Sequence, residues 1–363
     1  MKKVLIASYN LGYGGIETSL INLLKNMDLK KFNVTLVLEK KEGVFLSDVP
    51  KGIEVKEYRV SNNKNVFIRK GINLLKRIKW LLFNYKKYDS SICYATYSGP
   101  CSFVARTASN NKIMFVHNDY FEIYKENKKM TKDFFENLKI NEYNHIVFVS
   151  NESREKMQKL FPELKDNMIT INNLIDHKKI ITLSKEENIK KIKDKKVFLF
   201  IGRLDEEQKK VSRIIEVANL FKDNKDIEFW LLGDGVYKEE YEEKIKRYDL
   251  NNIKMLGAKK NPYPYIKACD CILLTSDYEG FPVVYNEAII LNKPIITTVC
   301  VSDEIINIED GFGKICNREI NSIVKAINTF LKKDFKIDKK LDFTLINKNR
   351  VDMIMRLLED NND

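Results

Sequence analysis

Strand-like segments, most of them short apolar runs, recur along the whole chain and are separated by polar and helical stretches. In the first half they lie at 3–8, 33–38, 53–58, 90–94, 112–116, 145–150 and 168–173. In the second half they lie at 197–201, 227–232, 253–256, 271–274 and 294–298. Short runs without polar alternation are typical of parallel strands that are buried on both faces. Helical patterns follow several of them, so the sequence predicts α/β domains of the doubly wound kind.

The length of 363 residues allows two such domains. Residues 185–196 are rich in lysine and lack an apolar stripe, which is typical of a connection between domains. We therefore expect a first domain at 1–183, a linker at 184–196 and a second domain at 197–340. The remaining segment, 341–363, begins with a helical pattern of apolar residues.

The most unusual predicted helix lies at 65–88. Its apolar positions follow one stripe at spacings of three and four: Ile68, Ile72, Leu75, Ile78, Leu82 and Tyr85. The segment has no acidic residue and seven basic ones: Arg69, Lys70, Lys76, Arg77, Lys79, Lys86 and Lys87. A basic amphipathic helix with aromatic residues is typical of a helix on an anionic membrane surface. The expected membrane contacts are Arg69, Lys70, Lys76, Arg77 and Trp80.

Two other interpretations of this segment stay open. It can be a helix that packs on the core and whose lysines are only solvated. It can also bind nucleic acid, although no helix-turn-helix, RNA-binding or zinc-finger pattern accompanies it. The net charge of +12 favours an anionic partner, without choosing among nucleic acid, a phospholipid surface and a phosphorylated substrate.

Composition narrows the class of protein. With 44% hydrophobic and 31% charged residues, the chain is globular rather than disordered. No apolar run approaches the roughly 18 residues of a membrane span. The N-terminal run is too short for a signal peptide, so we expect a cytoplasmic protein with reduced cysteines. The three histidines are too scattered for a zinc site: His117, His145 and His177.

The stretch from Asp277 to Glu287 holds the main candidate chemistry. It follows a predicted strand, and Gly280 and Pro282 break the chain there. Pro282 suits the first position of a helix, because an N–H in that turn has no partner to lose. Glu279 and Glu287 then lie on either side of a helix N-terminus, whose free N–H groups can hold hydroxyls and phosphates of a ligand. The alternative is an ordinary strand–loop–helix turn with solvated acids.

Polar residues follow other predicted strands as well. Arg203 and Lys209 flank the turn after the first strand of the second half, where two cations can neutralise a diphosphate. His117 stands at the carboxyl end of a parallel strand, where such sheets bind ligands. Gly14 and Gly15 follow the first strand of the chain. They let the backbone approach a ligand closely, or they only form a tight turn.

The string at 277–287, Asp-Tyr-Glu-Gly-Phe-Pro-Val-Val-Tyr-Asn-Glu, resembles the E-x7-E signature of retaining glycosyltransferases. In particular it is similar to glycosyltransferase family 4, also called group 1, which has the GT-B fold. Segments 168–176 and 202–209 also resemble segments of this family. The resemblance implies two Rossmann-like doubly wound domains that face a central cleft. It also implies a last helix that crosses back to the first domain.

The resemblance assigns a role to each residue of the donor site. Arg203 and Lys209 are expected to clamp the diphosphate of the nucleotide sugar. Glu287 is expected to bind the ribose hydroxyls, and Glu279 a hydroxyl of the donor sugar. His117 is expected to contact that sugar from the opposite domain. The other expected donor contacts are Gly14, Gly15, Gly233, Gly257, Gly280, Phe281, Pro282 and Val283.

One position departs from the family pattern. Glycine usually follows the lysine of the clamp, and Lys210 stands there in this chain. Glycine adopts backbone conformations that lysine rarely does. The loop around Lys210 is therefore the part of the clamp that the resemblance describes least well.

The resemblance implies a retaining glycosyltransferase that moves a sugar from a nucleotide sugar to an acceptor hydroxyl, and UDP is the expected nucleotide. No metal or other cofactor is expected, because two cations take the phosphate charge and no Asp-x-Asp motif is present. The expected acceptor is a lipid-linked or polysaccharide intermediate of bacterial cell-surface glycan synthesis, at the inner face of the cell membrane. The sugar stays open between glucose, galactose and an acetamido sugar. The alternatives are a catalytically silent GT-B partner subunit and a UDP-sugar epimerase of the same fold.

Overall fold

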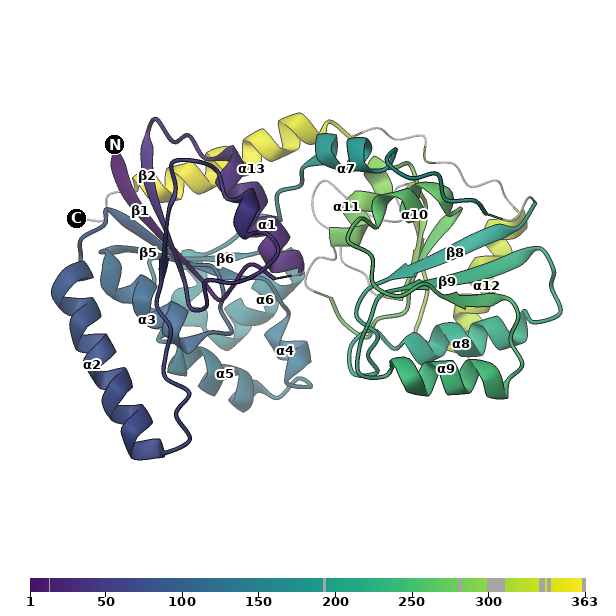
Figure 1. Ribbon diagram of the computed structural model, residues 1–363, viewed down its shortest axis with the longest axis horizontal. Helices are drawn as coiled ribbons and strands as arrows, with labels where there is room; N and C mark the ends of the chain where they lie inside the picture. The colour runs from purple at the N-terminus through teal and green to yellow at the C-terminus, as the bar shows by residue number, and fades with distance from the viewer. Residues whose placement is uncertain are drawn as a thin grey trace. The chain divides into compact units, whose positions relative to one another are not determined.

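The chain divides into two units (Figure 1). The first is Met1–Ile175 together with Thr344–Asp363, and the second is Asp176–Phe343. The computed structural model describes residues 1–12, 14–191, 194–279, 283–298, 311–332, 337 and 341–360. Each unit is built around one parallel sheet with helices packed on it. The fold class predicted from the sequence, two Rossmann-like α/β domains, is therefore confirmed.

The first unit contains a seven-stranded sheet whose described pairings are all parallel. Its strands are β1 (Lys2–Ser8), β2 (Phe32–Leu38), β3 (Glu54–Glu57), β4 (Ser90–Cys93), β5 (Asn111–Val116), β6 (His145–Phe148) and β7 (Met168–Thr170). They lie in the order β3-β2-β1-β4-β5-β6-β7. The direction of winding reverses between β1 and β4, which is the topological switch point of a doubly wound sheet.

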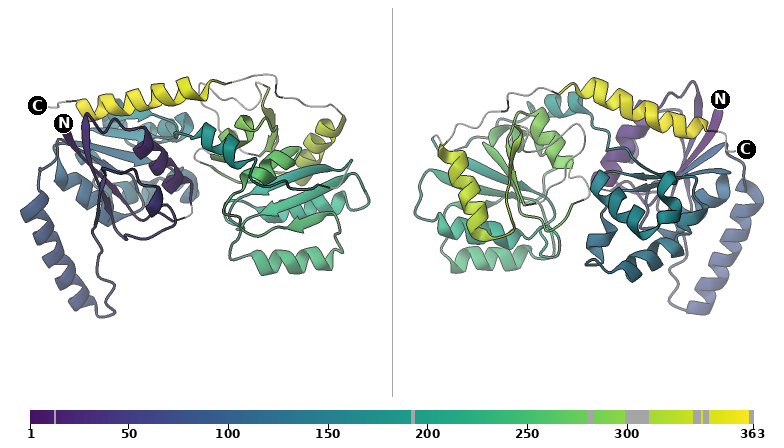
Figure 2. Two further views of the ribbon diagram at one scale, coloured as in Figure 1. Left: turned by 45° about the horizontal axis from the view of Figure 1, so that its top comes forward. Right: turned by 180° about the vertical axis from the view of Figure 1, so that it is seen from behind.

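Helices lie on both sides of this sheet (Figure 2). They are α1 (Gly15–Asn26), α2 (Val66–Asn84), α3 (Gly99–Ala108), α4 (Tyr120–Ile123), α5 (Lys128–Asn137), α6 (Asn151–Leu160) and α13 (Phe343–Glu359), with short 3-10 turns η1 (Leu46–Asp48), η2 (Ile140–Glu142) and η3 (Pro162–Asn167). Leu5 of β1 belongs to one hydrophobic cluster, and its neighbours Val4 and Ile6 belong to the other. Since successive side chains of a strand point to opposite faces, a strand covered on both sides must be apolar throughout.

The C-terminal helix α13 packs on the first unit. Ser90 Oγ donates a hydrogen bond to the carbonyl of Leu358, and Asn111 Nδ2 donates one to the carbonyl before it, each at 2.7 Å. The last carbonyls of a helix have no partner within the helix, so these strand residues complete its end. Near the start of α13, Asn347 bonds to both the N–H and the carbonyl of Ile175.

The second unit contains a six-stranded parallel sheet in the order β10-β9-β8-β11-β12-β13. The strands are β8 (Lys196–Ile201), β9 (Ile227–Leu232), β10 (Ile253–Met255), β11 (Cys271–Leu274), β12 (Ile295–Thr297) and β13 (Gly313–Ile315). The helices are α7 (His177–Leu183), α8 (Val211–Leu220), α9 (Lys238–Arg247), α10 (Tyr263–Ala268), α11 (Val283–Ile290) and α12 (Ile320–Lys332). The switch point of this sheet lies between β8 and β11.

The chain passes from one unit to the other earlier than the sequence predicts. Helix α7 is expected in the first domain, but it belongs to the second unit, where it contacts α10 and α11. Asp176 caps α7, because its Oδ1 accepts the N–H of Lys179 at 2.9 Å. Leu174 and Ile175, just before this point, are buried. A buried apolar crossing gives no compositional signal, whereas the lysine-rich segment after α7 does.

Candidate functional site

Two loops that the sequence analysis singles out meet at the carboxyl edge of the second sheet. Thr275 Oγ1 donates to the carbonyls of Lys209 and Lys210, at 3.1 Å each. The N–H of Asp277 donates to the carbonyl of Gln208 at 2.8 Å. The loop after β8 and the loop after β11 are therefore joined at the switch point, which is where ligands bind in sheets of this kind.

Lys209 and Glu279 form the central contact of this site. Lys209 Nζ lies 2.5 Å from Glu279 Oε1, and the two side chains are 17% and 7% exposed. Ser276 Oγ also donates to Glu279 Oε1, at 2.6 Å, and Gln208 Nε2 lies 3.4 Å from the other carboxylate oxygen. An ammonium has three N–H groups and the contact with Glu279 uses one. Lys209 can therefore bind an anionic ligand without leaving Glu279.

Arg203 lies at the same edge and is held by an acid that the sequence analysis missed. Arg203 Nε donates to Asp205 Oδ2 at 2.7 Å, while its side chain stays 67% exposed. Asp205 Oδ1 accepts the N–H groups of Gln208 and Lys209 at 2.8 and 3.0 Å. Burial raises the pKa of Asp205, but these N–H groups and Arg203 outweigh it and lower the pKa overall. Asp205 thus orients both residues of the predicted clamp.

Lys210 takes the backbone conformation that glycine favours. Its φ of 51° and ψ of 49° lie in the left-handed region, and it immediately precedes α8. This explains why the related pattern has glycine here. The lysine side chain reaches Asp277, with Nζ 3.7 Å from Oδ2. The departure from the family pattern therefore leaves the turn intact and adds a cation to it.

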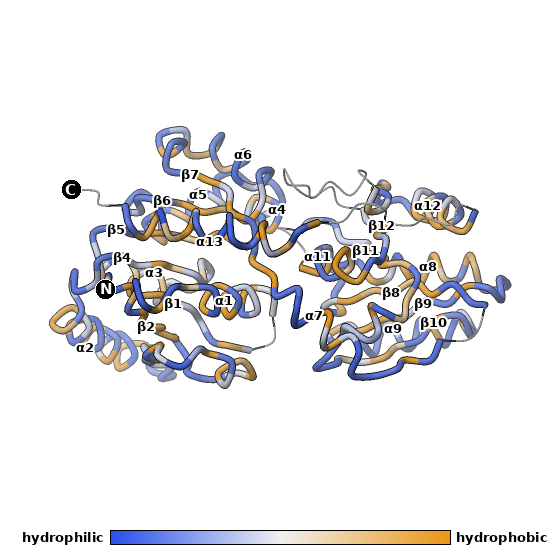
Figure 3. Tube along the Cα trace, turned by 90° about the horizontal axis from the view of Figure 1, so that it is seen from above, coloured by the Kyte–Doolittle hydropathy of each residue, from blue (hydrophilic) through white to orange (hydrophobic). Residues whose placement is uncertain are grey.

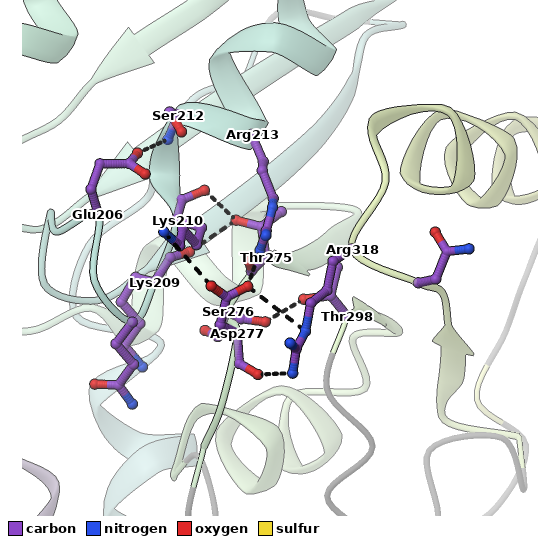
Figure 4. A network of polar contacts seen from close by, with 12 residues as sticks. Glu206, Lys209, Lys210, Ser212, Arg213, Thr275, Ser276, Asp277, Thr298 and Arg318 are labelled. Atoms are coloured by element: carbon purple, nitrogen blue, oxygen red, sulfur yellow. Dashed lines mark hydrogen bonds and ion pairs between the residues drawn. The ribbon is translucent and has the colours of Figure 1, made fainter. Parts of the chain in front are cut away.

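Asp277 gathers three cations around one carboxylate (Figure 4). Arg213 Nη1 lies 2.6 Å from Asp277 Oδ1, and Arg318 Nε lies 3.7 Å from the same oxygen. Arg213 also donates to the carbonyl of Thr275 at 2.8 Å. Together with Lys210, these arginines tie the loop after β11 to α8 and to the segment before α12. The sequence analysis missed both arginines, since each stands alone without a local pattern.

Two of the predicted donor-binding glycines lie in neighbouring loops at this edge. The N–H of Gly233 donates to the carbonyl of Gly257 at 3.1 Å, and Gly257 has a φ of +67°. A Cβ at Gly233 would lie 1.8 Å from the carbonyl oxygen of Gly202, and one at Gly235 would lie 2.2 Å from that of Leu204. No larger residue fits at Gly233 or Gly235 while the backbone stays in place. These loops therefore present their backbone at the edge of the sheet.

Glu287 lies in α11, which begins at Val283, and faces Tyr263 of α10. Burial raises the pKa of Glu287 to about 7, although a hydrogen bond with Tyr263 opposes the shift. Burial and the adjacent Glu287 raise the pKa of Tyr263. This carboxyl group therefore changes its protonation near neutral pH. Three of the predicted donor contacts lie outside the described residues: Gly280, Phe281 and Pro282.

In the first unit, His117 lies at the carboxyl end of β5 and is 6% exposed. Its ring centroid is 4.5 Å from that of Tyr94 and 5.8 Å from that of Phe115. Burial lowers the pKa of His117 to about 3, although Asn173 opposes the shift. The imidazole is therefore neutral near pH 7. It can donate a hydrogen bond to a hydroxyl or accept one from it, but it cannot supply a positive charge.

Gly14 and Gly15 lie at the start of α1, in the connection that follows β1 at the switch point of the first sheet. Gly14 has an extended backbone and Gly15 is the first residue of α1. Glu17 follows in the first turn, and burial raises the pKa of its carboxyl group. A Cβ at Gly14 would lie 2.2 Å from Glu17 Oε2, so the glycine leaves room for this carboxylate. Glu17 is a further polar group at the carboxyl edge of the first sheet.

The predicted membrane contacts lie on α2, and the structure separates them into two groups. The prediction that Trp80 contacts a membrane is wrong. Its side chain is only 8% exposed, and its Nε1 donates a hydrogen bond to Thr107 Oγ1 at 3.0 Å. Lys76 and Arg69 point to the segment before α2, where Lys76 Nζ donates to the carbonyl of Arg59 at 2.7 Å. Lys70 is exposed. In the described part of the chain, no helix is both long and apolar enough to cross a bilayer.

No group of three His, Cys, Asp or Glu side chains that could hold a metal ion is found within the described ranges. The cations at the β8–β11 edge are instead lysine and arginine side chains, which are paired with the carboxylates of Asp205, Asp277 and Glu279. This arrangement can bind phosphate oxygens directly through N–H donors.

Comparison with known protein families matches most of the chain. Residues 13–179 match the family described as Glycosyltransferase Family 4. Residues 182–349 match the family described as Glycosyl transferases group 1. The second match contains every described residue of the β8–β11 site, and the first contains His117.

Individual relatives agree with these family matches. A Campylobacter jejuni protein, N-acetylgalactosamine-N,N'-diacetylbacillosaminyl-diphospho-undecaprenol 4-alpha-N-acetylgalactosaminyltransferase, is 25% identical over 355 residues, or 92% of this chain and 91% of that protein. An uncharacterized glycosyltransferase of Methanocaldococcus jannaschii is 30% identical over 204 residues, which span 54% of this chain and only 50% of that relative. The Anabaena protein HepE, solved with UDP and glucose, is similar in fold, with a TM-score of 0.73 and 18% identity over 98% of this chain and 100% of that one.

Proposed function

The chain belongs to the group 1 glycosyltransferases of the GT-B fold, and on that premise we propose that it transfers a sugar from a UDP-sugar to a lipid-linked saccharide. The observation that carries the proposal is the cationic edge of the second sheet. Arg203 and Lys209 lie in one loop, and Asp205 bonds to both. Such a pair suits the diphosphate of a nucleotide sugar.

The cations act mainly on the leaving group. When the bond between the sugar C1 and the phosphate oxygen breaks, negative charge builds on the diphosphate. The exposed guanidinium of Arg203 can bind two phosphate oxygens, while Lys209 contributes a point charge. Donors that are already oriented stabilise this charge without reorganising, which is usually the largest part of such catalysis. Asp205 and Glu279 provide that orientation here.

UDP is the proposed nucleotide. The Anabaena structure of similar fold contains UDP and glucose. In this chain, Gly233 and Gly257 are partly exposed and have no side chain, so a base and ribose can approach their backbone closely. The raised pKa of Glu287 also suits a carboxyl group that accepts or donates hydrogen bonds to ribose hydroxyls. The donor sugar is a hexose or an N-acetylhexosamine.

Retention of the anomeric configuration is the proposed stereochemistry. The acceptor oxygen would bond to C1 on the face that the phosphate leaves, and the acceptor proton would pass to the departing phosphate oxygen. No enzyme nucleophile attacks C1 in this scheme, and the Glu279 carboxylate instead accepts hydrogen bonds from Lys209 and Ser276. The neutral His117 would contact a sugar hydroxyl. Lys209 and Arg203 take the charge, so the proposal needs no metal.

The proposed acceptor is a lipid-linked intermediate of cell-surface glycan synthesis, used at the inner face of the membrane. The name of the Campylobacter relative includes a diphospho-undecaprenol acceptor and an alpha linkage. An alpha product from an alpha-linked nucleotide sugar is what retention produces. The basic helix α2 in the first unit supports a location beside anionic lipid.

Calorimetry with UDP, GDP and several UDP-sugars tests the proposal. We expect saturable binding of UDP by the wild type and about tenfold or greater loss of affinity in Arg203→Ala. Arg247→Ala, at an exposed arginine of α9 in the same unit, is the matched control and should bind like the wild type. If the folded wild type binds no nucleotide, the chain is instead a silent GT-B partner subunit. If a UDP-sugar is converted without an acceptor, it is an epimerase.

A further inference from the structure

Helix α2 carries a row of large apolar side chains that face away from the first unit. Phe67, Leu75 and Leu82 are 86%, 68% and 75% exposed. Leu74 and Ile78 are exposed as well. These five positions fall on one side of a helix with 3.6 residues per turn. We call them the outward face of α2.

The opposite side of α2 is fixed to the first unit. Trp80 bonds to Thr107 and packs edge-on against Tyr58, with ring centroids 5.4 Å apart. Leu81 packs against the hydrophobic cluster that contains Trp80. Asn73 Oδ1 accepts the N–H of Ser61 at 2.7 Å. The outward face therefore belongs to a helix that side-chain contacts already anchor. Figure 3 shows α2 at the margin of the first unit.

The charges around the outward face have one sign. From Tyr58 to Tyr88 the sequence contains no acidic residue. Lys70 and Lys79 are exposed on either side of the apolar row. None of the basic side chains of α2 forms an ion pair with an acidic residue in the described parts of the chain. Lys70 and Lys79 are thus available to an external anionic partner, whereas Lys76, Arg69 and Arg77 contact other parts of the first unit.

We propose that the outward face of α2 lies in the surface of an anionic lipid bilayer, with Phe67, Leu75 and Leu82 among the acyl chains and Lys70 and Lys79 at the headgroups. Apolar residues flanked by lysine match the boundary between hydrocarbon and anionic headgroups. A second copy of the chain is a poorer occupant, because it would bring the same cations face to face. This inference deepens the lipid-linked acceptor of the proposed function and rests on it.

The structure therefore changes the contacts that the sequence predicts. Trp80 anchors the helix instead of entering the membrane, and Arg69 and Lys76 reach the segment at 59–63. Of the apolar stripe read from the sequence, Ile72 is only partly exposed. Phe67 and Leu74, which that stripe omits, belong to the outward face.

Cosedimentation with vesicles tests the proposal. The vesicles are phosphatidylcholine alone, or phosphatidylcholine with about one third phosphatidylglycerol. We expect the wild type to bind only the anionic vesicles. The triple variant Leu75→Gln, Ile78→Gln, Leu82→Gln should bind about tenfold less or not at all. The control Leu220→Gln, Val236→Gln changes exposed apolar residues of the second unit and should bind like the wild type.

Two charge-reversal variants, one on α2 and one control, complete the test. Lys70→Glu, Lys79→Glu should lose the preference for anionic vesicles, whereas Lys222→Glu, Lys225→Glu, at exposed positions of the second unit, should keep it. The proposal is overturned if the wild type ignores anionic vesicles, if the triple variant binds them normally, or if α2 instead joins two copies in a sizing experiment. Normal UDP binding in the triple variant separates failure of the membrane surface from failure of the proposed function.

Discussion

Lys209 and Glu279 lie 70 positions apart in the sequence, yet their side chains meet at 2.5 Å. The contact joins the loop after β8 to the loop after β11. It holds the ammonium group at the carboxyl edge of the second sheet, beside the loop that carries Arg203. The cation is thus oriented before a ligand arrives, which is the condition under which electrostatic stabilisation is most effective.

Lys209→Ala should remove this oriented charge. We expect kcat/KM for sugar transfer to fall by about 10²- to 10³-fold, the usual effect of losing one donor to a developing charge. Lys210→Ala is the matched control, because the neighbouring lysine points to Asp277 instead. Steady-state kinetics with a UDP-sugar donor compares the two. Equal losses in both variants would mean that Lys209 has no special role.

Glu287 should make the stability of the second unit depend on pH. Burial raises its pKa from an ordinary 4.5 to about 7, so the folded state holds the proton more tightly than the unfolded state. The stability from the neutral carboxyl group is complete below about pH 4.5 and is lost as the pH rises through about 7. Relative to Glu287→Gln, the wild type should lose about 2 kcal/mol of unfolding free energy between about pH 5.5 and pH 8.

Denaturant unfolding at the two pH values measures this difference. Glu239→Gln, at an exposed position of α9, is the control and should follow the wild type at both. If the difference in unfolding free energy between the wild type and Glu287→Gln is the same at both pH values, the carboxyl group of Glu287 does not titrate in this range.

Lys210 should carry a backbone cost that glycine removes. Its φ of 51° is unfavourable for a residue with a Cβ by about 1 kcal/mol. Lys210→Gly loses the 3.7 Å contact with Asp277 but gains this conformational energy. Lys210→Ala loses the contact and keeps the cost. We therefore expect the glycine variant to be about 1 kcal/mol more stable than the alanine variant. Equal unfolding free energies of the two variants would contradict this account.

Gly233 should tolerate no side chain. The Cβ of Gly233→Ala would lie 1.8 Å from the carbonyl oxygen of Gly202, so one of the two loops has to move. We expect UDP affinity to fall by about tenfold or more, together with a loss of stability of about 2 kcal/mol. Gly71→Ala is the opposite case, because nothing lies within 4 Å of its Cβ position on α2. It should stabilise the helix by about 0.5 to 1 kcal/mol and leave UDP affinity unchanged.

The core of both units could be predicted because both faces of each sheet are covered. Strands such as β1 and β8 are then apolar throughout and stand out from the polar segments around them. β13, with Gly313 and Ile315 around a lysine, has no such run and was not predicted. The passage between the units at Ile175 was missed because a boundary is predicted from polar composition. The residues at this boundary are instead as buried as those of a strand.

The candidate site could be predicted only where several residues form a local pattern. Glu279 belongs to such a string, and the structure joins it to Lys209. Asp205, Arg213 and Arg318 act through contacts between distant loops, and no spacing in the sequence marks them. The face of α2 was misjudged because periodicity shows which residues share a side of a helix, but not which side the protein covers.

The docking of α13 has a consequence for the order in which the protein is made. Ile354 and Leu358 complete a hydrophobic cluster that begins with Val4 and Ile6 of β1. The ribosome must therefore synthesise the whole second unit before the first can close this part of its core. During that interval an apolar patch of the nascent first unit stays open to solvent, and a chaperone that shields such surfaces has its longest opportunity to act there.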